Sequence, residues 1–277
     1  MVQHFTYTPN PDIAFAVIML HPGCNMTCTF CVTDNSFSSM TWKQATHLLD
    51  RFEGTAIEGV VLGGGEPLTW EPGVFELAQE AKHRGFHVQI GTNGIALPDD
   101  FVTIESVDRY VLPLDAIDED LHDTLRIYRK GHYSVIMDRL EKLRAAGKAV
   151  TVSTVVTQQN KDSLPDLAAF LSDYTKRGGA LHAWHLYKFV PEGRGGKKNA
   201  HALYLSNEEY DQACAQARQI KIDCPIYKRK DMFNSKTVDF FWAEGDAMRA
   251  CSQTSAVGTA QQPLHTCETY TFLPQPA

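Results

Sequence analysis

Apolar residues gather along the chain in short runs that alternate with amphipathic segments. The runs are continuous rather than interrupted by polar residues, which is typical of strands covered on both faces of a sheet. The segments between them repeat apolar residues at helical spacing. Six strand-then-helix units in succession favour a parallel sheet with right-handed crossovers. The predicted strands span residues 13–20, 59–63, 87–91, 109–115, 150–156 and 183–190.

Capping residues set the limits of the predicted helices. Thr41 with Gln44, and Ser206 with Glu209, each match the pattern of a capping box at a helix start. We therefore expect helices over 41–52, 74–84, 133–146 and 164–176, and a last one that begins at Ser206. Beyond about residue 221 the periodicity fades, and only 232–242 suggests one or two short strands. The economical division is a main domain over residues 1–205 and an irregular C-terminal extension over 206–277.

Composition narrows the class of protein. The 277 residues are 43% hydrophobic and 21% charged, values typical of a globular chain. The net charge of −7 argues against a general nucleic-acid-binding surface. The longest apolar run, Ile13 to Leu20, is too short to cross a bilayer, and no basic-then-apolar secretion signal opens the chain. We therefore expect a cytoplasmic protein with no membrane partner.

Three of the seven cysteines, Cys24, Cys28 and Cys31, follow the first predicted strand directly. Such crowding without a secretion signal points to metal or redox chemistry rather than to disulfides. An iron–sulfur cluster held by three thiolates would leave one iron open to another ligand. A zinc ion needs four ligands and would take His21 as the fourth, which would make the chain a zinc-stabilised binding module. Both sites fit the spacing.

A second motif, Gly63-Gly64-Gly65-Glu66-Pro67, follows the second predicted strand. The glycines permit close approach of backbone, and the proline stiffens the exit of the turn. The motif lacks the Lys-Ser/Thr ending of a Walker A loop. Because the carboxyl ends of parallel strands meet at one edge of a sheet, we expect this turn to lie with the cysteine loop.

Together the two motifs resemble those of the radical S-adenosylmethionine (SAM) superfamily. The CxxxCxxC spacing matches Cys24, Cys28 and Cys31, with the aromatic Phe30 before the third cysteine, and the GGEP motif matches 64–67. The resemblance covers roughly residues 13–200. Its further members in this chain are Thr92-Asn93-Gly94, Asp115, Arg126, Ser153-Thr154 and the strand 184–190.

This resemblance implies an α/β fold, a partial (β/α)6 barrel of the TIM type over about 13–205, with the extension over its open side. It also implies an enzyme in which the three cysteines hold a [4Fe–4S] cluster and SAM chelates the open iron. An electron donor such as flavodoxin or ferredoxin would then drive cleavage of SAM to a 5′-deoxyadenosyl radical, which abstracts hydrogen from a substrate.

The resemblance assigns a role to each cofactor-binding residue. The segment Gly64–Glu66 would bind the SAM amino group, Asp115 or Thr154 the ribose hydroxyls, and Arg126 the SAM carboxylate. Each of the last three also has a structural interpretation, as a cap, a core hydroxyl or a surface ion-pair partner. The expected cofactor-binding residues are Phe30, Gly64, Gly65, Glu66, Asp115, Arg126 and Thr154.

The substrate is predicted from cations in and after the sixth strand. A glycine-rich loop bearing cations at the active-site edge would suit an anionic group such as phosphate, so we predict a nucleotide- or sugar-phosphate-like small molecule. A solvated loop is the structural alternative, and modification of a ribosomal peptide or a cofactor precursor stays open. No residue is identified as catalytic. The expected substrate-binding residues are Lys188, Arg194, Lys197 and Lys198.

The four remaining cysteines are far apart in the sequence. They would just suffice for one further fully cysteine-ligated cluster, although Cys214 falls in a helical pattern and is expected in the core. They are Cys214, Cys224, Cys251 and Cys267.

Overall fold

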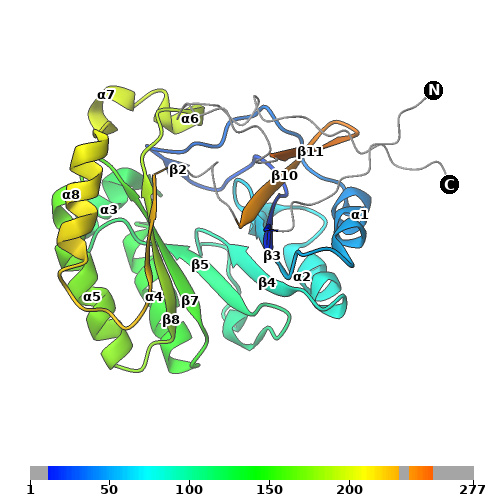
Figure 1. Ribbon diagram of the computed structural model, residues 1–277, viewed down its shortest axis with the longest axis horizontal. Coiled ribbons are helices and arrows are strands. Elements are labelled where there is room, and N and C mark those ends of the chain that lie inside the picture. The colour runs from blue at the N-terminus through cyan, green and yellow to red at the C-terminus, as the bar shows by residue number, and fades with distance from the viewer. Residues whose placement is uncertain (1–11, 231–236, 252–277) are drawn as a thin grey trace. The chain divides into compact units, whose positions relative to one another are not determined.

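The computed structural model describes residues 12–230 and 237–251, which form two compact units (Figure 1). The first unit contains 12–24, 35–91 and 237–251, and the second contains 25–34 and 92–230. The predicted division into residues 1–205 and 206–277 stays a prediction. It concerns where the family's core domain ends, whereas the two units are defined by their compactness.

The first unit is a five-stranded sheet with two helices. Its strands are β1 (Phe15–Met19), β3 (Gly59–Gly63), β4 (His87–Gly91), β10 (Val238–Glu244) and β11 (Ala247–Cys251), in the order β11-β10-β1-β3-β4. All neighbours are parallel except β10 and β11, which form a hairpin. The helices are α1 (Trp42–Phe52) and α2 (Val74–His83), and the short 3₁₀ turn η1 (Pro67–Thr69) follows β3.

The C-terminal residues are more regular than predicted. Strand β10 pairs in parallel with all five residues of β1, and β11 returns antiparallel after Gly245. Phe241 and Ala243 are fully buried, and the Phe241 ring contacts that of Phe52 with 4.8 Å between centroids. The one or two strands suggested within 232–242 correspond to β10 in its described part, whereas β11 was not predicted. Residues 238–251 complete the sheet of the first unit and are more regular than the expected extension.

The second unit contains a four-stranded parallel sheet in the order β5-β7-β8-β9. The strands are β5 (Arg109–Pro113), β7 (Val150–Val156), β8 (Leu181–Lys188) and β9 (Ile226–Arg229). A short antiparallel pair joins β2 (Thr27–Cys28) to β6 (Arg126–Ile127). The helices are α3 (Glu119–Leu125), α4 (Tyr133–Ala145), α5 (Leu164–Lys176), α6 (Gly193–Gly196), α7 (Ala200–Leu203) and α8 (Asn207–Ala217), with 3₁₀ turns η2 (Phe101–Thr103) and η3 (Lys161–Ser163).

The sheet of the second unit has two chemically different faces. One face packs against α5 and α8 (Figure 1). It is anchored by buried aromatic residues such as Tyr210 of α8, whose hydroxyl donates to the Leu186 carbonyl at 2.6 Å. Because strand side chains alternate, residues between the buried ones point to the opposite face. We call this opposite face the inner face. It carries Arg109, Val111, Ser153, Val155, His185, Tyr187, Tyr227 and Arg229.

The elements predicted from periodicity are confirmed over the described residues. Three strands have the predicted limits, and the other three differ at their ends by one or two residues. Both capping boxes form, with Gln44 N–H donating to Thr41 Oγ1 and Glu209 N–H donating to Ser206 Oγ. No helix in the part of the chain that the structure describes has the length and apolar character needed to cross a membrane.

Candidate active site

The GGEP turn is bound to the chain segment that leads into Cys24, within the first unit. Gly65 N–H donates to the His21 carbonyl at 2.7 Å, and Glu66 N–H donates to the Gly23 carbonyl at 2.7 Å. A Cβ on Gly65 would overlap the Gly23 carbonyl, so only glycine allows this approach. The Glu66 side chain is buried and accepts from Leu68 N–H at the start of η1. The turn therefore fixes the backbone just before the first cysteine.

A second glycine turn holds the other two cysteines, within the second unit. The N–H groups of Gly195 and Gly196 in α6 donate to the Cys31 carbonyl at 3.0 and 3.2 Å. A Cβ on Gly195 would lie 2.6 Å from the Cys31 nitrogen. Asn199 also donates from Nδ2 to the Thr29 carbonyl at 2.8 Å. This loop therefore packs by its backbone against the Cys28–Cys31 segment.

The cations predicted to bind substrate are not gathered by this loop around one site. Lys188 lies on the helix side of β8, where Nζ donates to Asn207 at 2.9 Å and sits 5.7 Å from the Tyr204 ring centroid. Lys197 pairs with Glu192 at 3.3 Å and is largely exposed. Arg194 and Lys198 are exposed as well.

Arg126 joins the cysteine loop to Asp115. Its Nε donates to Asp115 Oδ2, its Nη1 lies 3.7 Å from Cys28 Sγ, and its guanidinium carbon lies 4.9 Å from the Phe30 ring centroid. Burial alone lowers the pKa of Arg126, but the charges of Asp115, Cys28 and Cys31 outweigh burial and raise it. A permanently charged guanidinium beside two thiols suits ligands that bind metal as thiolates.

Two of the predicted SAM contacts are engaged within the protein. Asp115 is fully buried, and its second oxygen, Oδ1, accepts from Val155 N–H at 2.8 Å. Thr154 is also fully buried; its hydroxyl donates to the Leu114 carbonyl and accepts from Trp184 Nε1 at 2.9 Å. Thr154 lies on the helix-covered side of β7, in the role of a satisfied core hydroxyl.

A pair of buried histidines links the end of β5 to the loop after β4. His122 Nδ1 accepts from Asp115 N–H at 3.2 Å, so its Nε2 carries the proton and donates to His132 Nδ1 at 2.8 Å. His132 Nε2 donates in turn to the Asn93 carbonyl at 2.8 Å. Asn93 Nδ2 donates to Asn25 Oδ1 at 2.7 Å, beside the cysteine motif. This chain of hydrogen bonds fixes both imidazole tautomers.

The donor set can be tested against the two metal sites that the spacing allows. Cys24, Cys28 and Cys31 form no disulfide and are partly buried. His21 Nε2 lies 2.8 Å from the Glu66 carbonyl and 3.1 Å from Thr69 Oγ1, so this nitrogen is engaged with the GGEP turn and the residue beyond it. Across residues 12–230 and 237–251 no group of three or more His, Cys, Asp or Glu side chains is gathered for a metal ion. The three cysteines, two of them beside the Arg126 guanidinium, offer the donor set of a cluster with one open iron.

Of the other four cysteines, the structure describes the side chains of Cys214 and Cys224. Cys214 is fully buried on α8, and burial raises the pKa of its thiol. Burial likewise raises the pKa of Cys224, which lies just before β9, to about 11. The Cys251 side chain and Cys267 lie outside the described residues.

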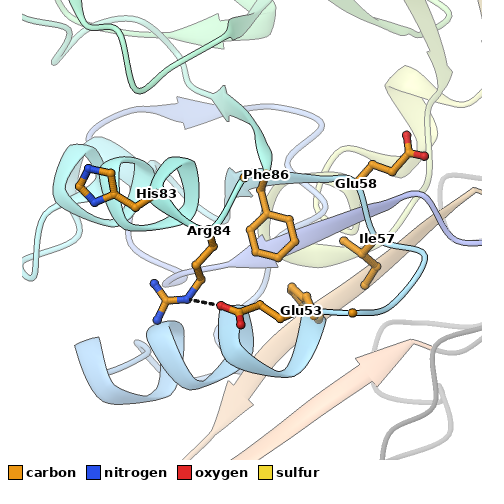
Figure 2. Close-up of a pocket in the computed structure, with 9 residues that line it drawn as sticks. Glu53, Ile57, Glu58, His83, Arg84 and Phe86 are labelled. Atoms are coloured by element: carbon orange, nitrogen blue, oxygen red, sulfur yellow. Dashed lines mark ion pairs between the residues drawn. The ribbon is translucent and has the colours of Figure 1, made fainter.

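Figure 2 shows a pocket of about 540 Å³ at the opposite end of the first unit's strands. It is lined by Glu58, just before β3, and Phe86, just before β4, whereas the GGEP turn follows β3. Arg84 in its wall pairs with Glu53 at 3.1 Å and with Asp50 at 2.7 Å. The carboxylates thus occupy the guanidinium, and this pocket is not part of the candidate site.

Comparison with known proteins identifies the family. The family model of the Radical SAM superfamily matches residues 18–171, more than half of the chain, which therefore belongs to this superfamily of enzymes that use SAM and a 4Fe–4S cluster. The AdoMet-dependent heme synthase of Methanosarcina barkeri is 29% identical over 187 residues, 65% of this chain and 52% of that protein. Mycofactocin maturase MftC of Mycobacterium tuberculosis is 29% identical over 179 residues, 62% of this chain and 44% of that protein. The chain thus spans about half the length of these curated relatives.

Solved structures confirm the predicted fold class. SuiB of Streptococcus suis bound to S-adenosylmethionine superposes with a TM-score of 0.68 over 91% of this chain and 63% of SuiB, at 15% identity. The same protein bound to its precursor peptide SuiA gives a TM-score of 0.60 over 78% of this chain and 49% of SuiB. At this identity the likeness concerns the fold alone.

Sequence reasoning missed the buried histidine pair and the role of the second glycine turn. His122 and His132 are ten positions apart, on a helix and in a loop, and only the tertiary fold brings them together. The glycines at 193–196 stood out in the sequence, but their partner, the Cys31 carbonyl, is remote along the chain. The basic run Lys228-Arg229-Lys230 lies at the end of β9, where the alternation of strand faces separates its members.

Proposed function

We propose that this chain cleaves SAM reductively at a [4Fe–4S] cluster held by Cys24, Cys28 and Cys31. The observation that supports the proposal most directly is the pair of glycine turns, one of which hydrogen-bonds to the backbone just before Cys24 and the other to the Cys31 carbonyl. Both turns follow the carboxyl ends of parallel strands, where α/β folds place their ligands. When bound, the cluster and SAM supply a 5′-deoxyadenosyl radical that abstracts hydrogen from a substrate.

The chain's own residues bind and orient in this proposal. The segment Gly64–Glu66 offers backbone and carboxylate acceptors to the SAM amino group, which is a strong donor. Arg126, packed on Phe30 and hydrogen-bonded to Asp115, balances the charge of the thiolates and presents its remaining N–H groups to the SAM carboxylate. Asp115 acts through Arg126, and Thr154 holds the strands beneath them.

For the substrate we propose a molecule that bears an anionic group. The cations at 194, 197 and 198 stay a prediction from the sequence, and the inner face of the second unit gives this class further support. Peptide modification is the second candidate, favoured by the superposition of 91% of this chain on SuiB, which also binds the precursor peptide SuiA. A third candidate substrate is a tetrapyrrole cofactor precursor, which the similarity to the heme synthase favours.

Anaerobic reconstitution of the full chain tests the proposal. We expect about four irons and four sulfides per chain, and formation of 5′-deoxyadenosine from SAM under strong reductant. The triple variant C24A/C28A/C31A should lose both, while Cys224→Ala, which removes a thiol remote from the motif, should keep both. Zinc without sulfide, or a loaded cluster that yields no 5′-deoxyadenosine, would contradict the proposal.

A further inference from the structure

Two arginines on the inner face of the second unit form no ion pair with a carboxylate of the described residues, although the charge of the adjacent Asp108 acts on Arg109. Arg229 ends β9 and is partly buried, and no carboxylate of the described residues pairs with its guanidinium. Arg109 begins β5, is 9% exposed, and its Nε has no hydrogen-bond partner. The chain carries a net charge of −7, so two unpaired guanidinium groups on one face are not explained by an excess of cations. Partly buried guanidinium groups without an ion pair invite an anionic ligand.

Strand alternation separates Arg229 from the lysines on either side of it. Lys228 and Lys230 both bind the carboxylate of Asp211 on α8, and their hydrogen bonds lower the pKa of that carboxyl group. Arg229 points to the inner face, opposite Tyr187 in the neighbouring strand. The basic run is therefore two structural lysines around one arginine that is available to a ligand.

The Arg229 guanidinium packs on an aromatic ring that belongs to a small aromatic cluster. Its carbon lies 5.0 Å from the Tyr227 ring centroid, an arrangement that holds the planar group in place. The Tyr227 ring meets the His185 ring edge-on at 5.1 Å, and His185 Nδ1 lies 3.2 Å from the Tyr187 hydroxyl. Burial, with the charge of Arg229, lowers the pKa of His185 to about 4, so this imidazole is neutral near pH 7. The surface thus combines one oriented cation with flat, uncharged walls.

This surface shares a strand with the turn that holds the cysteine loop. His185 and Tyr187 lie on β8, and the chain runs from the end of β8 into the α6 turn, whose Gly195 donates to Cys31. Arg229 and Tyr187 are register partners at the carboxyl ends of their strands. In the second unit, the cysteine loop and these side chains are therefore reached from the same strand ends.

We propose that the inner-face cluster of His185, Tyr187, Tyr227 and Arg229 binds the substrate, with a carboxylate or phosphate group on Arg229 and a flat apolar part against the aromatic rings. The inference rests on the proposed function and names the substrate chemistry for that same site. Arg109, deeper on the same face, adds positive potential that favours an anion. The two tyrosines and the histidine supply contact area at low cost in conformational entropy.

Binding of small probes to the reconstituted full chain tests this site. The probes are benzoate and phenylphosphonate, which separate carboxylate from phosphate recognition, and benzamide as a neutral counterpart of the same shape. Binding is measured by isothermal titration or ligand-observed NMR. We expect at least one anionic probe to bind at least tenfold more tightly than benzamide. Arg229→Gln should abolish this preference, and Arg229→Lys, which keeps the charge, should retain part of it.

Arg218→Gln is the matched control, because Arg218 donates to the Ile226 carbonyl of the same strand and is exposed on the surface. It should leave probe binding unchanged. Equal binding of benzoate, phenylphosphonate and benzamide, no binding of any probe, or anion binding that survives Arg229→Gln would overturn the inference. A weaker affinity for SAM in Arg229→Gln would also overturn it, since the arginine would then serve the cofactor.

The same samples separate failure of this inference from failure of the proposed function. Formation of 5′-deoxyadenosine without substrate reports SAM cleavage alone and should persist in Arg229→Gln. If wild-type protein binds the anionic probes but forms no 5′-deoxyadenosine, the proposed function is wrong. If it forms 5′-deoxyadenosine but shows no Arg229-dependent preference, only the inference is wrong.

Discussion

The buried imidazoles of His122 and His132 are neutral and each has one defined tautomer. Burial, with a contribution from the charge of Arg126, lowers the pKa of both rings to about 3. Asp123 Oδ1 accepts from the backbone N–H groups of His132 and Tyr133, which fixes His132 at the start of α4. The pair connects the backbone of Asp115, and through it Arg126, with the loop at Asn93. These histidines are positioning residues rather than proton donors.

This histidine pair predicts a loss of stability in mild acid. An unfolded histidine takes up a proton below about pH 6.5, whereas these rings in the folded protein do so only near pH 3, so the free energy of unfolding falls as pH decreases between these values. From pH 7 to pH 5 each ring should contribute roughly 2 kcal/mol of this loss. Urea denaturation of the full chain at the two pH values measures the change.

Variants of the pair show whether the imidazoles are the cause. The double variant H122Q/H132Q should be less stable at pH 7 and have a flatter pH dependence, while His201→Gln removes an exposed imidazole as a control. If the double variant keeps the full slope between pH 7 and pH 5, the acid sensitivity comes from other groups. Nitrogen chemical shifts of the rings give an independent measure of their tautomers.

Single residues also show where prediction from sequence ends. The thiols and the GGEP turn were predictable because their chemistry is written in contiguous spacing. The role of Arg229 was not, because residues 226–229 fall where the hydrophobic periodicity fades and β9 was not predicted. The histidine pair left no local signal, since its meaning depends on burial that only the folded chain creates.

At the scale of elements, the two glycine-rich turns have one task in common. Each follows a parallel strand, β3 or β8, and each forms backbone hydrogen bonds to the chain around the cysteine motif. The glycines serve contact between two backbones rather than contact with a phosphate. The position of these turns after parallel strands predicted that they lie at the active-site edge. It could not identify their partner, because contact with another backbone and contact with a phosphate both require glycine, which has no side chain.

Substitution of Gly195 should therefore damage the cysteine loop. A Cβ at this position would meet the Cys31 nitrogen at 2.6 Å and the Cys28 carbonyl, so either the turn or the loop must move. We expect Gly195→Ala to lower the stability by about 1–3 kcal/mol and to reduce the iron retained after reconstitution and gel filtration. Thermal unfolding and iron content measure the two effects.

Gly91→Ala, at the end of β4, is the matched control for the substitution in the α6 turn, because the nearest atom to its added Cβ is 3.9 Å away. It should retain iron as the wild type does. Equal iron content in Gly195→Ala and Gly91→Ala would show that the α6 turn does not hold the loop in the way that the backbone hydrogen bonds imply.

At the scale of the whole molecule, charge is distributed unevenly. The chain is acidic overall, and the cations near its exposed helices are paired with carboxylates, as Arg144 is with Glu141 and Arg177 with Asp173. The inner face of the second unit keeps two arginines without such partners. The ion pairs on the exposed helices cancel each other's charge, whereas the two arginines leave the inner face positive. This difference would steer an anion toward the inner face, more strongly at low salt.

We predict that the stability of the first unit depends on the hairpin of β10 and β11. Strand β10 covers the edge of β1, and buried Phe241 packs against Phe52 of α1. A chain that ends at Lys236 would expose that edge and lose this packing, and open parallel edges pair readily with other chains. We expect it to aggregate or to melt well below the wild type, as size-exclusion chromatography and thermal unfolding would show. A chain ending at Cys251 keeps both strands and separates loss of the hairpin from loss of the residues beyond it. If the chain ending at Lys236 is monomeric and unfolds at the same temperature as the wild type, β10 does not stabilise the sheet.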